Sequence, residues 1–199
     1  MLEPGASKQE IRDFYRARRK QIFNISGDQA SRLIAQNFLT SLPGITTQTL
    51  VAGYMPMAGE VDPRPVMENL EATEVKLLLP VVKKKDAPLS FYPYRGGDAL
   101  KKGMYGNDEP ENRKKAATPD IILVPLVAFD NTGTRLGQGG GFYDRTLAAI
   151  RAKKDILAIG LAFHGQMHEA LPKEPDDELL DAIVTEEGIF RFRAPGRPS

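Results

Sequence analysis

Hydrophobic residues gather in short runs along this chain. The clearest runs are Thr49–Tyr54, Val75–Leu79, Ile121–Leu126 and Ile156–Leu161. Unbroken runs of this length, rich in Val, Ile and Leu, are typical of strands that are covered on both faces. Weaker strand candidates follow the same pattern at Leu89–Tyr92, Ala182–Thr185 and Ile189–Phe192.

Amphipathic stretches precede and separate these runs. Ser7 and Glu10 have the spacing of a capping box, so a helix is expected to begin there. Asp28 is placed to cap a second helix, and further helical patterns cover Pro63–Leu70 and Phe142–Lys153. On the first helix, one stripe at helical spacing carries Lys8, Arg12, Tyr15 and Arg19.

Buried strands alternating with helices predict an α/β fold with a mostly parallel, Rossmann-like sheet flanked by helices on both faces. Residues 1–193 are expected to form a single domain. Residues 93–119 lack clear periodicity and are predicted to be a long excursion with a small hairpin. Residues 194–199, rich in proline, are predicted to be a flexible C-terminal tail.

Composition narrows the possible functions. The chain has 199 residues, a net charge of +1 and no cysteine, which excludes disulfides and cysteine nucleophiles. No apolar run reaches the roughly 18 residues of a membrane span, so we expect a cytoplasmic protein without a membrane partner. The basic stretch Arg12–Lys20 has no accompanying recognition motif, so we expect no nucleic-acid partner.

A glycine-rich turn, Gly137–Gly141, lies between the buried run Ile121–Leu126 and the helix expected from Phe142. Glycines permit positive φ, and the N-terminus of the next helix presents free N–H groups, which together favour an anion such as phosphate. The turn fits neither the Walker A pattern nor G-x-G-x-x-G, whose third glycine position is Phe142. The alternative interpretation is a surface loop that permits tight packing of helix against strand.

The residues around this turn resemble a specific family signature. Phe129-Asp130, Gly133, Arg135-Leu136-Gly137 and Gly139–Arg145 resemble the signature of the 5-formyltetrahydrofolate cyclo-ligase family. This family usually has two tyrosines before the aspartate, and here the first is Phe142. The resemblance continues over most of the chain, including Lys8 and Arg12, which match a Lys-x-x-x-Arg pattern on the first helix.

The resemblance implies an ATP-dependent enzyme. The implied reaction converts 5-formyltetrahydrofolate to 5,10-methenyltetrahydrofolate through phosphorylation of the formyl oxygen and ring closure by N10, releasing ADP and phosphate. Arg135 and Lys8 are the implied catalytic residues, and Asp144 and Asp181 are the candidate Mg²⁺ ligands. The implied nucleotide-binding residues are Lys8, Arg12, Arg135, Gly137, Gln138, Gly139, Gly140, Gly141, Phe142, Tyr143 and Asp144.

At the folate end, the resemblance implies that Glu60 contacts the pterin, because a carboxylate can accept two N–H bonds from its amino-pyrimidine edge. Met55, Tyr94 and Tyr105 are the other expected substrate contacts. The expected substrate is a folate, polyglutamylated or not, and the expected state is a monomer. The sequence alone leaves two alternatives open: a kinase or dehydrogenase on a similar sheet, and a nucleotide- or folate-binding regulatory module without turnover.

Overall fold

A seven-stranded sheet forms the centre of the molecule in this computed structural model, which describes residues 5–42 and 44–192. The predicted tail at 194–199 lies outside the described residues. The strands are β1 (Leu50–Ala52), β2 (Lys76–Val81), β3 (Ser90–Tyr94), β6 (Ile121–Pro125), β9 (Leu157–Leu161), β10 (Ala182–Thr185) and β11 (Gly188–Arg191). Their order is β11-β10-β9-β6-β1-β2-β3.

The sheet is parallel in its centre and antiparallel at both edges. Neighbours from β10 through β9, β6 and β1 to β2 pair in parallel, whereas β3 and β11 pair antiparallel to their neighbours. The predicted α/β fold with a mostly parallel sheet is therefore confirmed.

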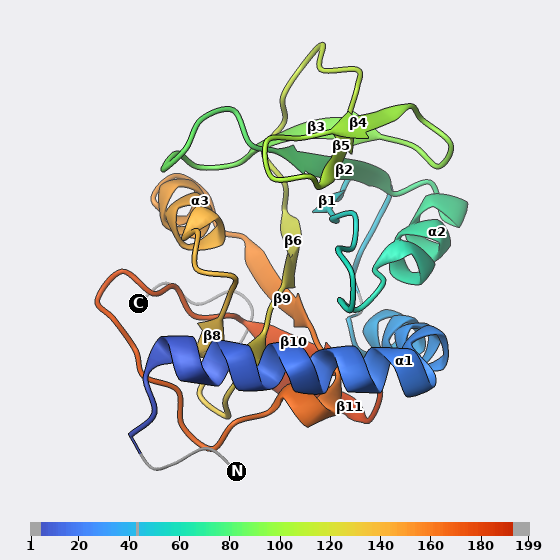
Figure 1. Cartoon of the computed structure of the whole chain (residues 1–199). Helices are drawn as coiled ribbons and strands as arrows, with labels where there is room; N and C mark the ends of the chain where they lie inside the picture. Colours follow the sequence, from blue (N-terminus) through green and yellow to red (C-terminus); the bar gives the residue numbers. More distant parts are fainter. Residues whose placement is uncertain (1–4, 43, 193–199) are drawn as a thin grey trace.

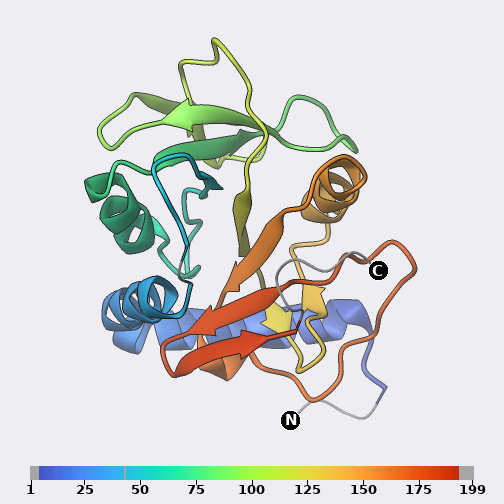
Figure 2. The same cartoon turned by 180° about the vertical axis from the view of Figure 1, so that it is seen from behind.

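Helices cover both faces of the sheet. Helix α1 (Lys8–Ser41) and helix α2 (Arg64–Ala72) pack on the face that includes Leu77 and Leu79, whereas helix α3 (Phe142–Arg151) packs on the face that includes Leu78. Alternate residues of one strand thus enter opposite core layers, as the pleat of a strand requires. Figure 1 shows α1 crossing in front of the sheet, and from behind, in Figure 2, β10 and β11 lie in front of α1.

The first two predicted helices form one kinked helix. Ser26 has non-helical backbone angles (φ −146°, ψ 15°), and its hydroxyl donates a hydrogen bond to the carbonyl of Ile22 at 3.4 Å. Such a local bond competes with the helical backbone pattern and bends helices. The predicted division into two helical segments is therefore present, but the break lies at Ser26, two residues before the cap expected at Asp28. The capping box at Ser7 and Glu10 is confirmed.

Two small hairpins bring separate segments to one side of the sheet. The excursion at 93–119 contains β4 (Leu100–Lys102) and β5 (Asp108–Pro110), so the hairpin predicted there is confirmed. A second hairpin, β7 (Ala128–Phe129) and β8 (Arg135–Leu136), directly precedes the glycine-rich turn. Its bend is held by Asp130, whose Oδ1 accepts the backbone N–H groups of Thr132 and Thr134.

No helix within the described ranges is long and apolar enough to cross a lipid bilayer. The remaining helical element is a single turn, η1 (His164–Gln166), which follows β9.

Candidate active site

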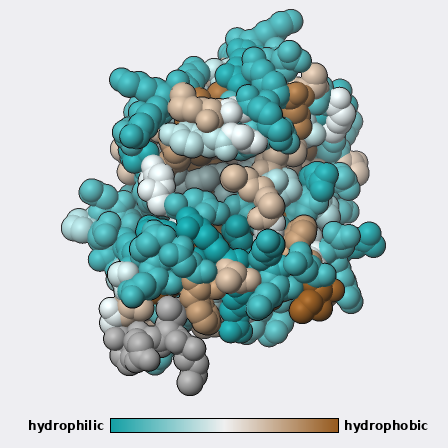
Figure 3. Space-filling view, viewed as in Figure 1, coloured by the Kyte–Doolittle hydropathy of each residue, from teal (hydrophilic) through white to brown (hydrophobic). Residues whose placement is uncertain are grey.

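A cavity of about 690 Å³ lies beyond the carboxyl ends of β1 and β6, where parallel α/β sheets bind their ligands. The space-filling view shows this face hollowed between α1 and the β4–β5 hairpin (Figure 3). Fourteen of the residues expected from the sequence line the cavity: Lys8, Arg12, Met55, Glu60, Tyr105, Arg135, Gly137, Gln138, Gly139, Gly140, Gly141, Phe142, Tyr143 and Asp144.

The glycine-rich turn forms one end of the cavity. Gly139 and Gly141 have φ of 100° and 62°, in the left-handed region that side chains disfavour. Gly141 immediately precedes α3, and no side chain caps that helix. The N–H groups of the first turn of α3 therefore have no helical partner, and the positive end of the helix dipole faces the cavity.

Helix α1 holds the turn through two arginines on successive helical turns. Arg12 donates from Nε to the carbonyl of Gly137 at 3.1 Å. Arg16 donates from Nε to Oε1 of Gln138 at 3.0 Å and from Nη2 to the carbonyl of Gln138 at 3.2 Å. These bonds occupy carbonyl groups of the turn and tie its backbone to α1.

Arg135 lies under the turn in a buried ion pair. Its side chain is only 3% exposed, and its Nη2 lies 2.6 Å from Oδ1 of Asp144. Its other terminal nitrogen donates to the carbonyl of Glu178. Burial lowers the pKa of Arg135, although the charge of Asp144 opposes this effect. The β7–β8 hairpin delivers the arginine, and the first turn of α3 delivers the aspartate.

Lys8 crosses the cavity mouth from α1 to the segment that follows η1. Its Nζ lies 2.7 Å from Oδ2 of Asp177 and 3.2 Å from Oε2 of Glu174. Burial alone lowers the pKa of Lys8, but the hydrogen bonds to these two carboxylates outweigh it and the pKa is raised. Burial tends to raise the pKa of Asp177, but its bond with Lys8 lowers it overall.

Glu60 lines the same cavity from the loop that follows β1. It is 4% exposed, and its Oε2 accepts the backbone N–H of Met57 at 3.0 Å. Its Oε1 lies 3.4 Å from both Nη1 of Arg19 and Nε2 of Gln138. Arg19 is also buried and donates to the carbonyl of Leu126 at 3.0 Å. A buried carboxylate in such a setting is held in one orientation by its donors.

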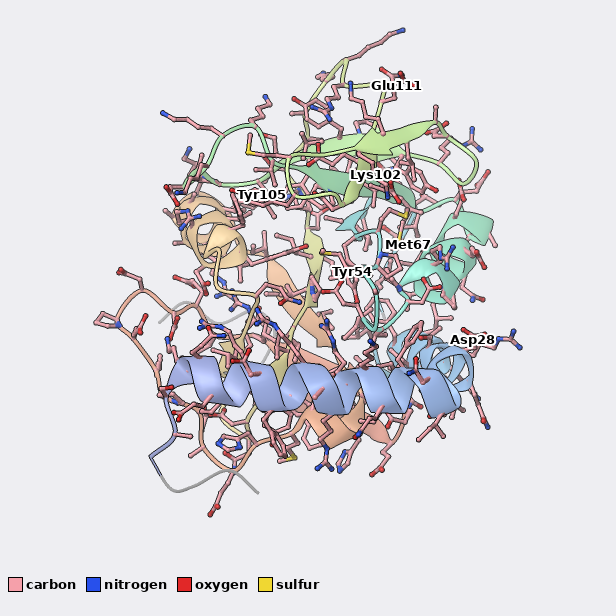
Figure 4. The ribbon with its side chains drawn as sticks, viewed as in Figure 1. Asp28, Tyr54, Met67, Lys102, Tyr105 and Glu111 are labelled. Carbon is pink, nitrogen blue, oxygen red and sulfur yellow. The ribbon has the colours of Figure 1, made fainter. Side chains whose placement is uncertain are left out.

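Aromatic rings complete the wall between the two ends. Tyr105, at the bend of the β4–β5 hairpin, packs edge-on against Phe142 with ring centroids 5.3 Å apart, and in Figure 4 it lies beside α3. Tyr54 lies near the centre of the same view and donates to the carbonyl of Val61 at 2.8 Å. Burial raises the pKa of Tyr54 and of Tyr143, so both phenols stay protonated.

Two of the expected site residues do not line the cavity. Tyr94 lies on the edge strand β3, opposite Leu77, and packs against the core beneath α2. Asp181 is buried, and its Oδ2 accepts hydrogen bonds from Nη2 of Arg151 and from the N–H of Ala158, both at 2.8 Å. Glu174 and Asp177 are the carboxylates that this C-terminal stretch brings to the cavity.

The cavity is also lined by residues outside the expected set, and three of them carry polar groups that bear on the site: Arg19, Tyr54 and Asp177. Arg19 carried a readable signal, because it shares the helical stripe of Lys8 and Arg12. Tyr54 has only the sequence signal of a residue that ends a strand, and nothing local in the sequence distinguishes Asp177 from Asp181.

An uncapped helix N-terminus behind a glycine-rich turn, with cationic side chains beside it at the carboxyl end of a parallel sheet, is an arrangement with which α/β proteins bind the phosphates of nucleotides. Comparison with known proteins makes the class specific. The family model described as "5-formyltetrahydrofolate cyclo-ligase family" matches residues 4–186. The chain belongs to this family.

Individual relatives agree with the family assignment. The chain is 32% identical to the 5-formyltetrahydrofolate cyclo-ligase of Haemophilus influenzae, over 89% of this chain and 97% of that protein. It is 32% identical to the Escherichia coli K12 enzyme of the same name, over 89% and 99% of the two chains. The solved structure of Aquifex aeolicus 5,10-methenyltetrahydrofolate synthetase superimposes with a TM-score of 0.78 at 32% identity, covering 96% of this chain and 95% of that one.

Proposed function

We propose that the cavity is the active site in which ATP and 5-formyltetrahydrofolate meet. The family reaction is the ATP-dependent conversion of 5-formyltetrahydrofolate to 5,10-methenyltetrahydrofolate, and this chain is an enzyme of that reaction. One observation carries the assignment of the site: the glycine-rich turn and the buried Glu60 line a single cavity.

The turn suits the triphosphate of ATP. Gly139 and Gly141 allow the backbone to approach an anion closely, and the uncapped N-terminus of α3 supplies N–H donors. Lys8 and Arg12 line the same end from α1, and Arg135 lies beneath it. We assign phosphate binding to these groups, with the backbone from Gly137 to Tyr143 and the ring of Phe142 forming the wall.

Mg²⁺ fits the same end. Magnesium usually takes only one or two protein carboxylates and completes its shell with water and phosphate oxygens. Asp144 lies beside the turn, and its Oδ1 accepts from Arg135, leaving Oδ2 for an ion. Asp177 lines the cavity nearby, whereas Asp181 is engaged elsewhere. When bound, the ion would neutralise charge on the phosphates. In the described parts of the chain, no group of three or more His, Asp or Glu side chains is placed to hold a metal ion.

Glu60 orients the folate at the other end. Its carboxylate accepts two N–H groups of the pterin edge, and Met55 and Tyr105 contact the rings. A polyglutamate tail is a further expectation for the substrate, and exposed Lys83, Lys84 and Lys85 between β2 and β3 supply the positive charge that such a tail needs. We also expect a cytoplasmic monomer.

The reaction requires the two substrates to be aligned and needs no nucleophile from the protein. The formyl oxygen attacks the γ-phosphorus of ATP, the bond to the bridging β–γ oxygen breaks, and ADP leaves. N10 of the folate then attacks the activated formyl carbon and loses its proton, and phosphate departs as the five-membered ring closes. Arg135 and Lys8 stabilise the charge on the transferred group, and the cavity brings formyl oxygen and phosphorus together.

The test is direct. Purified protein is mixed with ATP, Mg²⁺ and 5-formyltetrahydrofolate, and the near-ultraviolet absorbance of the methenyl product is followed. We expect product formation that depends on both ATP and the folate. Thermal stabilisation by either ligand without product would instead indicate a binding module without turnover.

A further inference from the structure

Gln138 lies between the two ends of the cavity. Arg16 donates to its side-chain oxygen at 3.0 Å and to its backbone carbonyl at 3.2 Å. A guanidinium can only donate, so the amide oxygen of Gln138 must face Arg16. The amide nitrogen therefore faces Oε1 of Glu60, at 3.4 Å.

The two oxygens of the Glu60 carboxylate are held differently. Its Oε2 is fixed by the N–H of Met57 at 3.0 Å, while Oε1 faces Gln138 and Arg19, each at 3.4 Å. Both 3.4 Å contacts are longer than the usual N–H···O distance of about 2.9–3.0 Å, so they have room to tighten. Hydrogen bonds in ligand-free active sites are often long and shorten when the complex forms.

We propose that Gln138, held by Arg16, is a positioning residue that couples nucleotide binding to folate binding. This inference rests on the proposed function. Phosphates bound at the turn fix the backbone of Gln138, its amide then holds Glu60 in the orientation that receives the pterin, and thermodynamic linkage makes the effect reciprocal. The Gln138 amide acts through Glu60 and does not need to touch the reacting atoms.

The experiment measures coupling. The Kd of 5-formyltetrahydrofolate is determined by calorimetry with and without the β,γ-imido analogue of ATP plus Mg²⁺. We expect the analogue to tighten folate binding by about tenfold in the wild-type protein, within the common range of allosteric coupling. Gln138→Ala should reduce this ratio to about twofold or less. Arg16→Ala should reduce it partly, because the amide then loses its fixed orientation.

Gln138→Glu separates the two contacts of this side chain. It keeps an acceptor for Arg16 but replaces the donor that faces Glu60 with a carboxylate, so the coupling should be lost and folate binding weakened. Gln29→Ala and Arg32→Ala, exposed positions on α1, are matched controls that should retain the wild-type ratio. Thermal unfolding of each variant verifies that it is folded.

Two results would overturn the coupling while leaving the function intact. One is a ratio near one in wild-type protein that still turns over its substrates. The other is a full ratio in folded Gln138→Glu. A wild-type protein that binds neither ligand and forms no product would contradict the proposed function, and the coupling with it.

Discussion

The two ends of the cavity are built differently. The centre of the proposed phosphate end comes from one continuous stretch, β8 through the first turn of α3, where its shape depends on backbone angles, and Lys8 and Arg12 are added from α1. The folate end is assembled from side chains of distant segments, namely the loop after β1, helix α1 and the β4–β5 hairpin. A site made of backbone is local in sequence, whereas a site made of side chains depends on the packing of the whole domain.

Helix α1 joins the two ends. Arg12 and Arg16 bond to the turn, and Arg19, further along the same helix, bonds to Glu60. The phosphate end thus owes its shape to backbone angles and a buried ion pair, and the folate end owes its shape to one buried carboxylate and its donors. We therefore expect a change at Arg135 to impair mainly the use of ATP, and a change at Glu60 to impair mainly the use of the folate.

The largest effect is expected from Arg135→Ala. This change removes a buried charge and leaves Asp144 without its 2.6 Å partner. We expect kcat/KM for ATP to fall by more than about tenfold, the scale of a lost charge-assisted contact, with a smaller change in the folate KM. Steady-state kinetics with each substrate varied in turn measures both quantities.

Exposed Arg95→Ala is the matched control for this change and should behave as wild type. Unfolding experiments on both variants distinguish a lost ligand from a lost fold. Near-normal ATP kinetics in a folded Arg135→Ala protein would exclude Arg135 as a phosphate ligand.

A similar but complementary effect is expected from Glu60→Ala. The pterin loses its paired acceptor, so we expect the folate KM to rise by about tenfold and far more than the ATP KM. Exposed Glu68→Ala on α2 is the control. Equal increases in both KM values would contradict the division of the cavity into two ends.

The same difference explains what the sequence can predict. Gly137–Gly141, Arg135 and Asp144 lie close together along the chain, and all of them line the cavity. The sheet was predictable because its buried strands are continuous apolar runs. The β7–β8 hairpin could not be predicted in this way, because strands of two residues have no periodicity. This hairpin is defined instead by the turn that Asp130 holds.

Predictions from the sequence are wrong mainly where side chains from distant segments must be placed in one site. Tyr94 and Tyr105 are both aromatic residues of the region after β2, and only the fold shows that Tyr105 reaches the cavity while Tyr94 packs under α2. Asp177 and Asp181 differ in their positions relative to the sheet. Asp181 directly precedes β10 and pairs with Arg151, whereas Asp177 lies in the loop and pairs with Lys8.

A smaller effect is expected within the turn. Gly141 has φ of 62°, and an added Cβ would lie 2.6 Å from Nη1 of Arg145, whereas a Cβ on Gly137 would meet nothing within 4 Å. Gly141→Ala should lower the free energy of unfolding by about 1 kcal/mol, the cost of a left-handed backbone for an L-residue, and raise the ATP KM. Gly137→Ala should cost less. Urea denaturation of the two variants measures the difference, and equal losses would contradict the dependence on backbone angle.

The smallest effect concerns the Lys8–Asp177 pair at the cavity mouth. The folded-state pKa of Asp177 is lowered from its ordinary value of 3.8, so its stabilisation is present above that value and is lost as the pH falls through the folded pKa. The pKa of Lys8 is raised above 10.5, so its contribution is present below that value and is lost as the pH rises through the folded pKa. Between these limits, Asp177→Asn should lower the free energy of unfolding by less than about 1 kcal/mol, because solvent and salt screen a partly exposed pair.

This difference between wild type and Asp177→Asn should diminish as the pH falls below 3.8 and through the lowered folded-state pKa of Asp177, and it should shrink in high salt. Urea unfolding across this range measures it, with exposed Asp155→Asn as the control that should show no such trend. A difference that persists in acid would mean that the ion pair with Lys8 is not the source of the stabilisation. In the proposed function, Lys8 exchanges a carboxylate for a phosphate when ATP binds, and a strongly held lysine would make that exchange costly.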